Sequence, residues 1–243
     1  MQNINYKNTS LTPFDDDQQF ILKEILEVLQ SEFLVVNCEK NDLEKQLSCF
    51  HHRYTLEVGA MLLQILTLQK LLYNDDEQRK KEVEEQEYVF REQFQRSKNI
   101  KIKELNVEEQ NEIKKKFRKA SFLCHPDIVS SENKEIAQQI FIDLKKAYDN
   151  NELEKVTEIL NNLETDTFFN LNKQQISEID KLMLEIQKLK TQIKEINKYI
   201  DNIKKSETYQ IIINIENWDK YFVDIKEQLF LTLHKLKNEV LKK

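Results

Sequence analysis

Apolar residues recur every three or four positions along most of this 243-residue chain, a pattern that predicts amphipathic α-helices. Pro13, followed by a run of acidic residues at 15 to 17, marks the start of a first helix that is predicted to end near Val36. Asn41 and Glu44 have the spacing of a capping box, so a second helix is predicted to begin there. The positions predicted to face inward in these two helices are Ile21, Ile25, Leu29, Phe33, Leu43, Leu47, Phe50, Tyr54, Met61, Ile65, Leu68 and Leu72.

Residues 74 to 76 break this pattern, and a third, highly charged helix is predicted to follow through Val83, Phe90 and Phe94. Gly59, the only glycine, lies inside the second helix, where we expect it to permit close helix packing.

The C-terminal part has the most regular repeat. Four uninterrupted heptads predict a coiled coil, residues 209 to 215 interrupt it with β-branched side chains, and a last helix is predicted from near Glu216. The heptad helix and the last helix either fold back on each other as an antiparallel hairpin, or each of them pairs with another copy of the chain. Isoleucine at both core positions disfavours a simple parallel dimer. The heptad core positions are Ile179, Leu182, Ile186, Leu189, Ile193, Ile196, Ile200 and Ile203.

Between these flanks, two shorter apolar stripes predict a pair of antiparallel helices. The link between them contains His125-Pro126-Asp127. A residue before proline is disfavoured in the helical region, so the first helix should end near Cys124 or His125. Ser131 and Glu132 suit the start of the next helix, and Asn151 with Glu154 suits the start of a short third one. The two stripes are Ile113, Phe117, Ala120 and Cys124, then Ala137, Ile140, Phe141, Leu144, Ala147 and Tyr148.

The segment from about Glu104 to Glu164 resembles a J-domain, the module through which co-chaperones stimulate ATP hydrolysis by DnaK-type chaperones. It is most similar to the auxilin-like branch, in which a basic helix of the form IKKxFRKA precedes the HPD tripeptide and a helix with F-x-x-L-x-x-AY follows it. Ile113 to Ala120 match the first pattern, and Phe141 to Tyr148 match the second.

The resemblance implies a docking role for particular side chains. Asp127, with His125 and Pro126, would engage an arginine of the chaperone's nucleotide-binding domain, as a carboxylate on a rigid loop can do. The basic helix would meet an acidic surface of the chaperone through Lys114, Lys115, Arg118 and Lys119. The chain departs from the family in two ways: Ile128 stands where many members have lysine, and the first short helix with its tyrosine-leucine signature is not recognisable.

The amino-acid composition limits the fold class and the kinds of partner that this protein can have. One glycine and two prolines in 243 residues favour long helices. With 37 basic and 43 acidic residues, the net charge of −6 argues against general nucleic-acid binding. No uninterrupted apolar run approaches membrane-spanning length and the start of the chain has no secretory signal, so we expect a cytoplasmic protein without membrane contact. The cysteines lack metal-like spacing and fit reduced thiols; they are Cys38, Cys49 and Cys124.

Catalytic chemistry has little support. His51 and His52 are adjacent and point about a hundred degrees apart on a helix, so they do not suit a metal site. His234 fits a surface position. No nucleophile, glycine-rich loop or paired acid accompanies the HPD tripeptide, so we expect neither an enzyme nor a cofactor.

The sequence therefore predicts an all-α protein with four parts: a flexible N-terminus (1–14), an N-terminal helical or coiled-coil region (15–97), a J-like domain (98–164) and a C-terminal coiled-coil hairpin (165–243). The expected function is that of a J-domain co-chaperone that recruits a DnaK-type chaperone, with coiled-coil arms that bind a client or form a homo-oligomer. The alternative is a helical adaptor whose J-like hairpin does not bind a chaperone.

Overall fold

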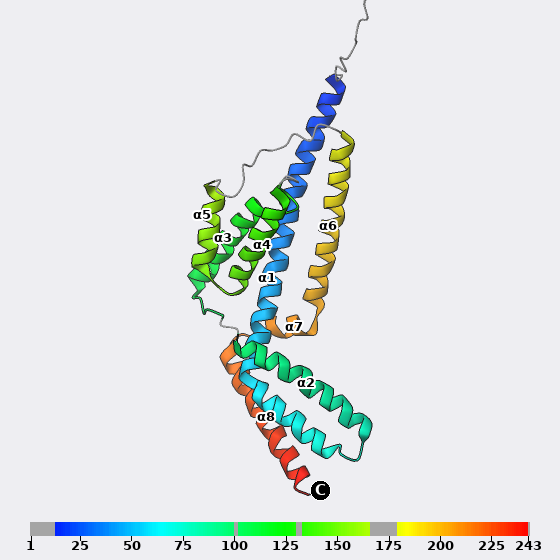
Figure 1. Ribbon diagram of the computed structural model, residues 1–243, viewed down its shortest axis with the longest axis vertical. Helices are drawn as coiled ribbons and strands as arrows, with labels where there is room; N and C mark the ends of the chain where they lie inside the picture. The colour runs from blue at the N-terminus through cyan, green and yellow to red at the C-terminus, as the bar shows by residue number, and fades with distance from the viewer. Residues whose placement is uncertain (1–12, 100–101, 130–132, 166–178, 243) are drawn as a thin grey trace, which may run out of the picture. The chain divides into compact units, whose positions relative to one another are not determined.

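The structure, a computed structural model, describes residues 13–99, 102–129, 133–165 and 179–242, with side chains from Asp17 onward. All regular elements in these ranges are helices and none is a strand, which confirms the predicted all-α class (Figure 1). The predicted flexible N-terminus lies outside these ranges except for its last two residues, and so do Ser131 and Glu132.

The helices in the described ranges follow the chain in a simple order. They are α1 (Pro13–Leu72), α2 (Glu77–Asn99), α3 (Val107–Cys124), α4 (Lys134–Asp149), α5 (Leu153–Glu164), α6 (Ile179–Lys205), α7 (Glu207–Ile213) and α8 (Trp218–Val240). As predicted, a turn at 73–75 ends α1 before the charged α2 begins.

The chain folds into two compact units, and each unit joins two separate stretches of sequence. Unit 1 combines Met1–Asn41 with Glu104–Asp201, so it holds the first half of α1, the α3–α5 helices and most of α6. Unit 2 combines Asp42–Lys103 with Asn202–Lys243, so it holds the second half of α1 with α2, α7 and α8. Helix α1 is therefore shared by both units.

The predicted break between a first and a second helix is wrong, because α1 runs for 60 residues through that region. No glycine or proline lies between Val36 and Glu44 to stop the helix. Asn41 does not cap a helix; its buried side chain instead accepts a hydrogen bond from Nζ of Lys145 at 2.8 Å.

The predicted inward stripe at the start of α1 is only half right. Leu29 and Phe33 are buried, but Ile21 is 56% exposed and Ile25 is 38% exposed. A stripe at strict steps of four drifts by about 40° per step around a helix of 3.6 residues per turn, so its early members leave the buried face. Leu26 occupies that face instead.

Unit 2 contains a tight crossing of α1 with α2. An added Cβ on Gly59 would lie 2.6 Å from Cδ2 of Phe94, a separation that real Cβ atoms do not show. The lone glycine thus permits the close packing that the sequence predicted. Further along the same two helices, the mostly buried Glu87 accepts hydrogen bonds from Lys70 at 2.9 Å and from Arg91 at 2.5 Å.

The other end of unit 2 is built around aromatic rings. Phe50 of α1 stacks on Phe222 of α8 at a centroid distance of 6.0 Å, and Trp218 meets Phe50 edge-on at 5.5 Å. Ile212 of α7 is buried in the same cluster. The β-branched stretch after the heptads thus forms a short helix, and α8 begins two residues after the predicted Glu216, at a cap formed by Asn217.

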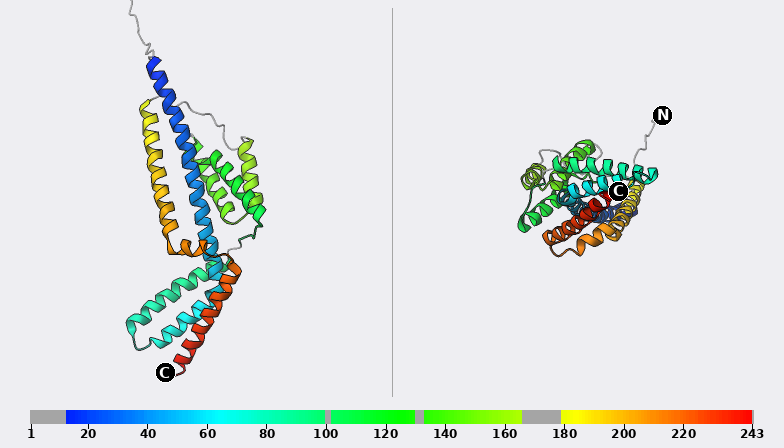
Figure 2. Two further views of the ribbon diagram at one scale, coloured as in Figure 1. Left: turned by 180° about the vertical axis from the view of Figure 1, so that it is seen from behind. Right: turned by 90° about the horizontal axis from the view of Figure 1, so that it is seen from below.

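Helix α6 carries the predicted heptads as one uninterrupted helix. Its buried positions are Leu182, Ile186, Leu189, Ile193, Ile200 and Ile203. Within unit 1, α6 runs beside the first half of α1, as the views of Figures 1 and 2 agree. Most of α6 lies in unit 1 and α8 lies in unit 2.

Helix α1 is also long and apolar enough to cross a membrane by length and composition alone. Its most apolar 18-residue window has a mean hydropathy of 1.3 and is 17% buried. Core helices of water-soluble proteins pass the same test, so the absence of membrane contact stays a prediction.

Candidate functional site

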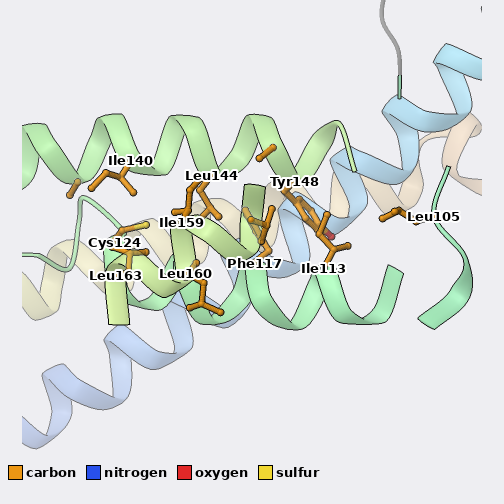
Figure 3. Packing of buried hydrophobic residues seen from close by; sticks show 14 residues of the cluster. Leu105, Ile113, Phe117, Cys124, Ile140, Leu144, Tyr148, Ile159, Leu160 and Leu163 are labelled. Atoms are coloured by element: carbon orange, nitrogen blue, oxygen red, sulfur yellow. The ribbon is translucent and has the colours of Figure 1, made fainter. Parts of the chain in front are cut away.

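The HPD tripeptide lies at one end of a packed cluster of three helices. Helix α5 packs against both α3 and α4, and α3 packs against α4. Phe117 and Tyr148 stack at a centroid distance of 4.1 Å in the centre of the cluster, and both are fully buried (Figure 3). All the apolar positions predicted for the two stripes are buried or partly buried here. The hairpin core thus follows the helical periodicity of the sequence.

The start of α3 carries a capping signal that the sequence analysis missed. The side chain of Asn106 accepts from the backbone N–H of Glu109, and the Glu109 carboxylate accepts from the backbone N–H of Asn106, both at 2.9 Å. Each bond satisfies a donor that the first turn would otherwise leave unpaired. The box fixes where the basic helix begins.

The capping box predicted at Asn151 is wrong. Asn151 has a φ of 60°, and the residue that precedes α5 is Glu152, which makes no side-chain cap bond. A left-handed asparagine is a common way to end a helix. Asn151 therefore belongs to the turn that ends α4, while α5 begins at Leu153.

The tripeptide forms a tight turn at the predicted place. Helix α3 ends at Cys124, and His125 takes an extended backbone conformation with φ of −67° and ψ of 125°, as expected before proline. The carbonyl of His125 accepts hydrogen bonds from the N–H of Ile128 at 2.9 Å and from that of Val129 at 3.2 Å. Pro126 is half-buried inside this turn. The turn is therefore closed by its own backbone.

The imidazole of His125 points into the fold and is 6% exposed. It meets Phe33 of α1 edge-on at 5.0 Å and Phe141 of α4 at 4.7 Å. Its Nδ1 accepts from the N–H of Asp127 at 3.3 Å. Burial lowers the pKa of His125 to about 4, so the ring is neutral at pH 7. His125 thus holds the turn in shape from inside.

Asp127 lies at the surface of the turn but is engaged by its own chain. Its side chain is 25% exposed. Gln192 of α6 donates to Oδ2 at 3.3 Å, Lys188 of α6 lies 3.8 Å from Oδ1, and Lys134 of α4 lies 3.9 Å from Oδ1. The residue that the resemblance assigns to a chaperone's arginine is thus surrounded by two cations and an amide of unit 1.

The basic residues of α3 form an exposed face. Lys114, Lys115, Arg118 and Lys119 are all exposed, and whether they form a docking surface stays a prediction. Lys119 forms an ion pair with Glu164 of α5. The neighbouring Lys116 turns toward α5 instead and donates to the hydroxyl of Thr157 at 2.8 Å. The face therefore remains cationic and open to solvent.

Phe122 is a surface feature that the sequence analysis did not single out. Its side chain is 55% exposed, and it follows Lys115 by seven residues and Arg118 by four, so the three share one face of α3. The sequence could have revealed this residue, because Phe122 lies outside the apolar stripe of its helix and is therefore predicted to be exposed. Ile128, at the position where many J-domains have lysine, lies half-buried in the turn.

The remaining candidates form no site in the described ranges. No group of three or more histidine, cysteine, aspartate or glutamate residues is placed there to hold a metal ion. His51 is exposed and His52 partly buried, and His234 is exposed beside Asn238. Cys124 is fully buried, and burial raises the pKa of its thiol to about 12.

Comparisons with known proteins add no family to this description. No protein-family model matches the chain, and searches of curated proteins and of solved structures give no match.

Proposed function

We propose that this protein is a J-domain co-chaperone, which recruits a DnaK-type chaperone and stimulates its ATP hydrolysis. The observation that carries the proposal is the placement of an HPD turn at the end of a helix with an exposed cationic face. Asp127 would bind a guanidinium of the chaperone, while Lys114 and Lys115 would attract an acidic surface. Phe122 adds apolar area next to those cations. The other helices would bind a client or a second copy.

The proposed stimulation does not require a catalytic group on this chain. The chaperone performs the hydrolysis, and docking raises its rate if the turn binds the hydrolysis-competent state more tightly than the resting state. The buried His125 is consistent with a structural role and not a catalytic one, because it shapes the turn that presents Asp127.

Single-turnover ATP hydrolysis by a DnaK-type chaperone tests the proposal. We expect saturating wild-type protein to accelerate hydrolysis and Asp127→Asn to lose more than tenfold of that effect, since truncating one partner of a buried charge pair costs about 2–5 kcal/mol. Asp143→Asn is a matched control, because Asp143 is an exposed aspartate of α4 away from the turn. It should stimulate like the wild type.

Charge reversal on α3 provides a second test of the same proposal. Lys114→Glu with Lys115→Glu should slow association with the chaperone several-fold at low salt and much less at high salt, because screening weakens exposed charges. Equal stimulation by the wild type and by Asp127→Asn would contradict the assignment of Asp127.

One observation favours the alternative function, a helical adaptor with a J-like hairpin that binds no chaperone. Asp127 is engaged by α6 and His125 is covered by α1, so little of the tripeptide faces solvent. If no concentration of the protein stimulates the chaperone, and release of the α6 contacts does not change this, the adaptor function is the better account.

A further inference from the structure

The two oxygens of the Asp127 carboxylate are both engaged within unit 1. Gln192 donates to Oδ2, while Lys188 and Lys134 flank Oδ1. A guanidinium that binds a carboxylate in a bidentate way needs both oxygens. A chaperone arginine and the α6 side chains therefore compete for the same two atoms.

A second element of unit 1 lies against the same turn. Phe33 of α1 packs edge-on against the ring of His125. Further along α1, Asn41 accepts from Lys145 of α4. These contacts hold the first half of α1 against the hairpin, and α6 runs beside that half of α1 (Figures 1 and 2). The HPD turn is thus covered from two helices outside the α3–α5 cluster.

The contacts of α6 with Asp127 are weak by their geometry. The Nζ atom of Lys188 lies 3.8 Å from the carboxylate, and the Lys188 side chain is more than half exposed. Exposed ion pairs of this kind add little to stability. The Oε1 atom of Gln192 is buried without a hydrogen-bond partner, which is unfavourable as long as α6 stays in place. The polar contacts with Asp127 therefore cost little to break, and the buried apolar stripe of α6 is what mainly holds the helix in unit 1.

We propose that α6 is an autoinhibitory helix, which covers Asp127 in the resting protein and must move away before a DnaK-type chaperone can dock. This inference rests on the proposed function. The closed and open forms are two states of unit 1, and the chaperone binds only the open one. Its apparent affinity is then reduced by the fraction of molecules that are open.

A pair of double variants on α6 tests the proposal in the full-length chain. Lys188→Ala with Gln192→Ala removes the two α6 side chains that reach Asp127. Gln187→Ala with Lys190→Ala removes the same residue types from exposed positions of the same helix. Alanine favours helix at all four positions, so both variants should keep the helical content of the wild type in circular dichroism.

The first measurement needs no chaperone. Carbodiimide coupling of an amine to exposed carboxylates, read by peptide mass spectrometry, reports how accessible Asp127 is. We expect about tenfold faster labelling of Asp127 in the Lys188/Gln192 variant, which corresponds to about 1.4 kcal/mol. The control variant should label like the wild type. Equal labelling in all three proteins would overturn the inference, whatever the chaperone does.

The second measurement is the concentration of each protein that gives half-maximal chaperone stimulation. We expect the Lys188/Gln192 variant to need about tenfold less protein than the wild type, and the control variant to need the same amount. Loss of the Lys188 charge by itself would weaken attraction to an acidic chaperone surface, so it cannot explain a gain.

The outcomes separate the inference from the function on which it rests. Faster labelling with unchanged stimulation would overturn the autoinhibitory role and leave the co-chaperone function in place. Faster labelling without stimulation by any of the three proteins would overturn both. Faster labelling together with stronger stimulation is the result we expect.

Discussion

The buried imidazole of His125 makes the stability of unit 1 depend on pH in a defined direction. Burial lowers its pKa from 6.5 to about 4; the Asp127 charge opposes this shift and the Lys40 charge adds to it. The unfolded chain binds a proton at this ring more readily than the folded chain does. Protonation therefore favours unfolding.

The size of the effect follows from the two pKa values. The stabilisation is complete above pH 6.5 and is lost as the pH falls through the folded value near 4. A difference of about 2.5 pKa units corresponds to roughly 3 kcal/mol of unfolding free energy. That is a large fraction of the total for an ordinary domain, which is about 5–15 kcal/mol.

The matched variant is His125→Gln, because a glutamine side chain does not titrate and can accept the N–H of Asp127 that His125 now accepts. Urea unfolding followed by circular dichroism gives the unfolding free energy of each protein at neutral and acidic pH. Other titrating groups are common to both proteins and cancel in the comparison. We expect the wild type to lose about 3 kcal/mol more than the variant between about pH 7 and about pH 4.

Parallel pH profiles for the two proteins would refute this reasoning. A His125 ring resonance that titrates near 6.5 in the NMR spectrum of the folded protein would refute it directly. Either result would mean that the imidazole is solvated and that Phe33 and Phe141 do not enclose it.

Three further outcomes can be measured on the same protein. Gly59→Ala should lower the unfolding free energy by about 1–2 kcal/mol in urea, because its Cβ meets the Phe94 ring; in a Phe94→Leu background the same change should be neutral or stabilising. Glu87→Gln should cost about 1–2 kcal/mol near pH 7. Lys70 and Arg91 hold the pKa of Glu87 below 4.5, so this cost should shrink as the pH falls below that value. In thiol titration of the folded protein near pH 8, the buried, high-pKa Cys124 should react only after urea is added; prompt reaction would contradict its burial.

Most helices could be predicted from the sequence, but some of their ends could not. An asparagine three residues before a glutamate occurs five times, at 41, 74, 106, 151 and 161, and the one at 106 forms a capping box. Asn106 follows the non-helical stretch 102–105, so its backbone can turn into α3. Asn41 lies inside a continuous apolar stripe that keeps the helix going, and Asn151 takes a left-handed turn. The spacing alone does not distinguish these cases, because the preceding backbone decides which one forms.

The position and shape of the HPD turn were also predictable, because proline restricts the residue before it and the two stripes set the hairpin. The covering of the turn by Phe33, Lys188 and Gln192 was not predictable. Periodicity shows that α1 and α6 each have an apolar face, but not which faces meet. Polar side chains that reach a carboxylate across more than 60 positions leave no local signal.

The sharing of α1 between two units has a practical consequence for work with shortened versions of this protein. A fragment cut at the boundaries of the J-like segment would lack Phe33 and α6, the neighbours of the tripeptide. Under the proposed autoinhibition, such a fragment would stimulate a chaperone without restraint, so mapping by deletion would hide the control that the intact polypeptide exerts.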